Sequence, residues 1–84
     1  MSKNEKLIRR VLSCPSNLTY SEFSGFMKIF GYIEDDSPNG SRVKFYKGIH
    51  VLAGIHKPHG KNGAVMKIYM IKNAIDFLKE KGDL

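Results

Sequence analysis

The stretch SRVKFYKGIHVLAGIH, residues 41–56, decides the fold because it contains two strand-like segments with a turn between them. Its first half alternates apolar and polar residues, and its second half is rich in apolar and β-branched residues, a composition typical of strands. Alternation along the first strand places Val43 and Phe45 on one face and Arg42 and Lys44 on the other. The stretch therefore predicts an antiparallel hairpin with an apolar face and a basic face.

The length of the connecting loop determines which residues share each face. A two-residue loop, residues 47–48, pairs Phe45 with His50 and mixes polar and apolar side chains on both faces. A three-residue loop, residues 47–49, pairs Phe45 with Val51 and gathers the apolar side chains on one face, as burial of a single face requires. The predicted cross-strand pairs are then Phe45–Val51, Val43–Ala53 and Ser41–Ile55.

With this register the opposite face carries Arg42, Lys44, Tyr46, His50 and His56. Arg42 is expected to lie across from Gly54, with His56 diagonal to it and within reach of a long side chain. The packing of the hairpin thus predicts that a guanidinium group and an imidazole project from the same side of the sheet.

The rest of the chain reads as helices and one short strand. Residues 3–13 and about 69–81 show helical spacing of apolar residues. Thr19 and Glu22 form the pattern of a capping box before a third helix, which Gly31 ends. Residues 32–36 form a short strand. The predicted fold is a single α+β domain over residues 1–84, with the order α-α-β-β-β-α and helices packed on one face of a three-stranded antiparallel sheet.

Basic charge is concentrated in one segment of the sequence. The chain has 14 lysines and arginines against 8 acidic residues, a net charge of +6. No acidic residue lies between Asp36 and Asp76, although seven basic residues do. A surface that serves solubility alone intersperses the two signs more evenly. The distribution therefore predicts a polyanion or an acidic protein as the partner.

The single cysteine, Cys14, excludes an intrachain disulfide. No cleavable leader and no apolar run of membrane-spanning length is evident. We therefore expect a cytoplasmic protein without a membrane segment, and we expect no cofactor.

The order and spacing of several short motifs resemble those of the HicA toxins of bacterial type II toxin–antitoxin systems. The motifs are GSRVKF at residues 40–45, HKPHG at residues 56–60, and a lysine and tyrosine before a final amphipathic helix. The resemblance extends over residues 5–83. It implies a fold like the double-stranded RNA-binding domain, cleavage of messenger RNA without a metal, and inactivation by a HicB antitoxin protein.

The chain departs from the HicA signature at one position. The family has Gly-Ser-His followed by an apolar residue, and this histidine is the one assigned to catalysis. Here Gly40 and Ser41 match, but Arg42 occupies the third position, so the catalytic histidine cannot be transferred to this chain.

Other residues have the chemistry that metal-free RNA cleavage requires. Histidine accepts and donates protons near neutral pH, and the planar guanidinium of arginine suits a phosphate. We hypothesise that His56 is the general base, that Arg42 and Lys44 bind the scissile phosphate, and that His59 or His50 assists. The remaining candidates for binding RNA phosphates are Ser41, Lys57 and Lys67.

Simpler interpretations of these residues remain open. His50 can be a solvent-facing strand residue, and His56 and His59 can be structural residues that flank the turn at Pro58. Zinc binding is disfavoured because neither a thiol nor a carboxylate lies near the histidines. Ser41 is better explained as a turn hydroxyl or a phosphate ligand than as a nucleophile.

The basic face together with the resemblance to the HicA family implies two classes of function. The first is a toxin that cleaves RNA and is neutralised by an antitoxin. The second is a non-catalytic module of the same fold that binds RNA or an antitoxin. A DNA-binding accessory protein is a poorer third, because no recognition helix is evident.

Overall fold

The structure is a computed structural model that describes residues 2–36, 42–56 and 65–84. In chain order its elements are α1 (Lys3–Leu12), α2 (Tyr20–Ile29), β1 (Ile33–Asp36), β2 (Arg42–Lys47), β3 (His50–His56) and α3 (Ile68–Glu80). The strands form an antiparallel sheet in the order β1-β2-β3. The predicted α+β class, element order and sheet are confirmed.

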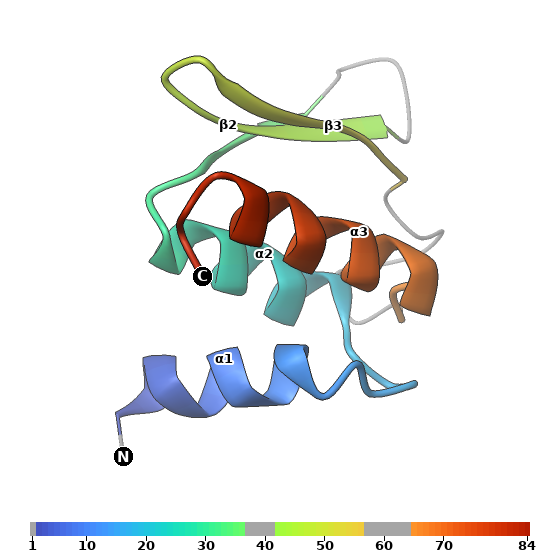
Figure 1. Ribbon diagram of the computed structural model, residues 1–84. Coiled ribbons are helices and arrows are strands. Elements are labelled where there is room, and N and C mark those ends of the chain that lie inside the picture. The colour runs from blue at the N-terminus through green and yellow to red at the C-terminus, as the bar shows by residue number, and fades with distance from the viewer. Residues whose placement is uncertain (1, 37–41, 57–64) are drawn as a thin grey trace.

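The elements form three layers (Figure 1). The sheet forms one outer layer, α2 and α3 pack beneath it, and α1 packs below them on the side away from the sheet. Contacts join α2 to β1, α3 to β3 and α1 to α2. No helix of the described part of the chain covers the other face of the sheet, which we call the outer face.

Local signals in the sequence set the ends of α2. The Thr19 hydroxyl accepts a hydrogen bond from the Glu22 amide at 3.2 Å, and the Glu22 carboxylate accepts one from the Thr19 amide at 3.1 Å. This reciprocal arrangement satisfies two amides that the helix leaves unpaired. Beyond the other end Gly31 has a φ of 88°, a conformation that favours glycine. Both predicted signals are confirmed.

The core lies between the sheet and the middle layer of helices. Phe45 of β2 is fully buried and contacts Phe23 of α2 edge to face, with ring centroids 5.6 Å apart. The helical spacing predicts a buried stripe on α3 of Ile71, Ala74, Ile75 and Leu78, widened by Met70 and Phe77. All of these are buried except Phe77, which is partly buried and packs against the core. One continuous core therefore holds the helix-covered face of the sheet in place.

The predicted register of the hairpin is wrong. Lys47 pairs with His50, so the loop has two residues, 48–49, which is neither of the loops considered from the sequence. Phe45 therefore pairs with Leu52 instead of Val51. Farther along, Val43 pairs with Ile55, which shifts the register by one residue. Ala53 and Gly54 together face Lys44, and Gly54 has a φ of 79°.

This irregularity is a β-bulge, which places two residues of one strand against one of the other. It lets both ends of the hairpin bury apolar side chains despite the short loop. Phe45 with Leu52 on one side of the bulge and Val43 with Ile55 on the other all face the helices. Unbroken alternation along β3 would place this extra residue in the loop, which is why the predicted loop has three residues.

Candidate functional site

Arg42 and His56 are direct cross-strand partners at the end of the β2–β3 hairpin. Directly opposite residues in an antiparallel pair project from the same face, with Cβ atoms about 4.5–5.5 Å apart. Their neighbours Val43 and Ile55 are buried against the helices, so Arg42 and His56 lie on the outer face. Both are exposed. The predicted shared face is confirmed, although the structure pairs Arg42 with His56 and not with Gly54.

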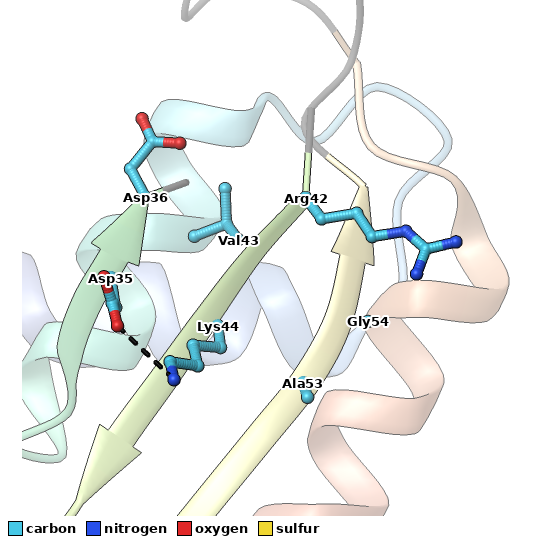
Figure 2. Close-up of a pocket in the computed structure, with 7 residues that line it drawn as sticks. All are labelled: Asp35, Asp36, Arg42, Val43, Lys44, Ala53 and Gly54. Carbon is cyan, nitrogen blue, oxygen red and sulfur yellow. Dashed lines mark ion pairs between the residues drawn. The ribbon is translucent and has the colours of Figure 1, made fainter. Parts of the chain in front are cut away.

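Neither of these two side chains has an ion pair or a hydrogen bond within the described part of the chain. The four ion pairs found there involve other residues. Arg42 extends across β3, away from Asp35 and Asp36 (Figure 2). A guanidinium group and an imidazole are therefore adjacent, accessible and without a partner among the described residues, which suits them to a phosphodiester.

Lys44 lies two residues farther along β2 on the same face, and it pairs across the sheet with Asp35 of β1. Their side chains approach to 3.5 Å between Nζ and Oδ2, as the dashed line in Figure 2 marks. Both are about half exposed, so solvent weakens the ion pair. Lys44 is thus available to an anion at a small cost.

An open depression of about 450 Å³ lies at this end of the sheet. Within the described residues it is lined by Asp35, Asp36, Arg42, Val43, Lys44, Ala53 and Gly54. The bulge contributes to the hollow because Gly54 has no side chain, and no described atom lies within 4 Å of where its Cβ would be. Figure 2 shows the charged groups around its rim.

Sequence reasoning missed Asp35 as part of this site. It lies before the acid-free segment, so the distribution of charge along the chain did not associate it with the basic strand. The signal was the pairing of the strand at residues 32–36 with β2, whose register brings Asp35 opposite Lys44.

His50 does not belong to this face, contrary to the prediction. It pairs with Lys47, whose Nζ donates a hydrogen bond to the Phe30 carbonyl on the helix-covered side at 3.0 Å. The Nδ1 atom of His50 is buried and has no hydrogen-bond partner among the residues that the structure describes. The two-residue loop is the cause, since it reverses the faces of His50 and Val51 relative to a three-residue loop.

The other predicted site residues are placed less directly. Lys67 is exposed and immediately precedes α3, in the helical layer, so it does not share the outer face with Arg42. Ser41, Lys57 and His59 lie outside the described residues. Their predicted roles in binding or cleavage stay predictions.

The helix-covered side of the sheet has its own cluster of ionisable groups. Asp83 accepts hydrogen bonds from Lys47 and from the Tyr32 hydroxyl, the latter at 2.8 Å. The hydrogen bond from Lys47 lowers the pKa of Asp83, and burial together with the Asp83 contact raises the pKa of Tyr32 to about 12. Lys47, Tyr32 and Asp83 are therefore structural partners of one another.

The described residues contain no group of three or more histidine, cysteine, aspartate or glutamate side chains able to hold a metal ion. Among the helices of that same part of the chain, none is both long and apolar enough to cross a membrane.

Comparison with protein-family models, with curated proteins and with solved structures gives no match for this chain.

Proposed function

We propose that this protein is an endoribonuclease that cleaves RNA without a metal, and that it acts as the toxin of a type II toxin–antitoxin system. The observation that carries the ribonuclease proposal is the pairing of Arg42 with His56 on the uncovered face of the sheet. The toxin role, messenger RNA as the substrate and a HicB-type antitoxin as the partner rest on the resemblance to the HicA family.

The proposed reaction uses the 2′-hydroxyl of RNA as the nucleophile. His56 takes its proton while the oxygen attacks the adjacent phosphorus, and the bond from phosphorus to O5′ breaks. The products are a 2′,3′-cyclic phosphate and a 5′-hydroxyl, which takes up one proton. Arg42 stabilises the negative charge that develops on the phosphoryl oxygens. The sequence predicts that His59 or His50 assists. Because His50 lies on the helix-covered side of the sheet, His59 is the proposed donor of the second proton.

The adjacency of the two groups matters because the base and the cation must act on the same phosphodiester. Cross-strand neighbours satisfy this requirement without a conformational change, since the sheet fixes the separation of their backbones. Lys44, on the same face, supplies a second cation for a neighbouring phosphate. The open depression leaves room for a polymer to lie across the sheet.

Cleavage of a short RNA by the purified protein in EDTA tests the proposal. We expect products that end in a 2′,3′-cyclic phosphate, and we expect His56→Ala to reduce the rate about 10²- to 10⁴-fold. His50→Ala is the matched control: it removes a histidine from the other end of the same strand, on the opposite face, and should keep cleavage. His59→Ala tests the second proton transfer.

Unchanged cleavage by a folded His56→Ala variant overturns the assignment of the base. Salt-sensitive RNA binding by the wild-type protein without any cleavage overturns the enzyme and favours the binding-module interpretation.

A further inference from the structure

A row of apolar side chains crosses the outer face at the hairpin end of the sheet. Ile33 of β1 pairs with Tyr46 of β2, and Tyr46 pairs with Val51 of β3, so the three side chains lie side by side on one face. Ile33 is 54% exposed and Val51 is 49% exposed, and Tyr46 is half-buried between them. Exposed apolar side chains that adjoin one another in this way usually mark a binding surface.

The ring of Tyr46 is not used elsewhere in the part of the fold that the structure describes. Within the described residues it belongs to none of the aromatic pairs, and its hydroxyl forms none of the hydrogen bonds. Tyr32, by contrast, packs against Phe77 and bonds Asp83. Of Tyr32 and Tyr46, only Tyr46 is therefore available to contact a ligand.

Charge on the same strand indicates which ligand fits the row. Arg42, Lys44 and Tyr46 alternate along β2 and project from the same face, at intervals of about 7 Å. This spacing is comparable to that of successive nucleotides in an extended single strand. Two cations followed by an aromatic ring match a chain that carries a phosphate and a flat base in every unit.

We infer that the row Ile33–Tyr46–Val51 is a stacking platform for one unpaired base of single-stranded RNA, whose adjacent phosphates bind Lys44 and Arg42. The inference rests on the proposed function and adds to it the strandedness of the substrate and a specificity residue. A duplex cannot use the platform, because the face of each base is covered by the neighbouring bases and only the base edges are accessible in the grooves.

The test measures binding of a fluorescent 2′-O-methyl oligonucleotide, whose blocked 2′ position prevents cleavage, by the wild-type full chain. The same strand annealed to its complement is the duplex probe. We expect tighter binding of the single strand. Tyr46→Ala should weaken single-strand binding about 5- to 150-fold and leave duplex binding unchanged.

Two further substitutions at position 46 separate stacking from simple apolar contact. Tyr46→Phe keeps the ring and should bind the single strand like the wild type, whereas Tyr46→Leu keeps apolar volume and should lose binding. Tyr69→Ala removes a tyrosine of α3 that is 55% exposed, and it is the control that should leave binding unchanged. Thermal unfolding of each variant verifies that it is folded.

Failure of the inference can be distinguished from failure of the proposed function. Arg42→Ala should weaken binding of both probes and should lower the log–log salt slope of single-strand binding by about 0.7, whereas Tyr46→Ala should leave that slope unchanged. If Arg42→Ala weakens binding but Tyr46→Ala does not, the inference that the row stacks on a base is wrong. The row would then be better explained as a binding surface for a protein. If Arg42→Ala also has no effect, the phosphate site itself is wrong.

Discussion

Basic side chains on the two faces of the sheet differ in their contacts: they have partners within the fold on the helix-covered face and are exposed on the outer face. On the helix-covered face Lys47 is bound to Asp83 and to a backbone carbonyl, and the valine and phenylalanine of β2 are buried. On the outer face Arg42 and His56 are exposed and have no partner in the described part of the chain. The basic character of a residue therefore says little about its role until its face is known.

Removing Phe45 should produce the largest effect on the helix-covered face. Phe45→Ala deletes a fully buried ring in contact with Phe23 and should lower the free energy of unfolding by about 3–5 kcal/mol, measured by urea denaturation. Val51→Ala on the outer face should cost about 1 kcal/mol or less. Equal losses at the two positions would show that the faces do not differ as described.

A smaller loss is expected from Asp83, which holds the end of the chain against the sheet. Asp83→Ala should lower the free energy of unfolding by about 2 kcal/mol at pH 7, because Lys47 and Tyr32 both lose a charged partner. The pKa of Asp83 is below its ordinary value of 3.8, so its contribution is complete above that pH and is lost as pH falls through the folded pKa.

Urea denaturation at pH 7 and pH 3 therefore checks both the size and the sign of the Asp83 contribution. The difference between wild type and Asp83→Ala should be smaller at pH 3. A difference that grows on acidification would contradict the assigned partners.

Replacing Gly54 tests the β-bulge, which determines which residues of β3 lie on each face of the sheet. Gly54→Ala puts a side chain at a φ of 79°, and should cost about 1–2 kcal/mol even though no described atom obstructs the added methyl group. Gly25→Ala is the control, because Gly25 lies inside α2 and its added Cβ makes an ordinary contact with Leu7 at 3.5 Å. Thermal unfolding measures both variants, and Gly25→Ala should be neutral or stabilising.

The smallest effect is a gain. Asp35→Asn removes the carboxylate that pairs with Lys44 and should tighten RNA binding a few-fold, since Lys44 is freed and one repulsion with phosphate disappears. Anisotropy titrations at low salt measure the change, and Asp76→Asn, on α3, is the control for net charge. Weaker binding by Asp35→Asn would mean that Asp35 takes part in the site.

Most of the fold could be predicted because its signals are local. The capping box at Thr19, the stop at Gly31 and the periodicity of α3 each depend on residues a few positions apart, and all three agree with the structure. The shared face of Arg42 and His56 was also predictable, because burial of the apolar residues fixes the opposite side.

The face of His50 could not be obtained by the same argument. A bulge adds one residue without changing the composition of the strand, so periodicity alone assigns that residue to the loop. Gly54 inside β3 was the available signal, since glycine in a strand often marks a bulge. Asp35 was missed because its place depends on pairing between strands and not on any local pattern.

A double-mutant cycle between Arg42 and His56 tests the central claim most directly. RNA cleavage by the wild type, Arg42→Ala, His56→Ala and the double variant is compared as kcat/KM. If both groups act on one phosphodiester, the double variant loses less than the product of the single losses, with an interaction energy of about 0.5–3 kcal/mol. Losses that multiply to within about 0.5 kcal/mol would contradict a shared site.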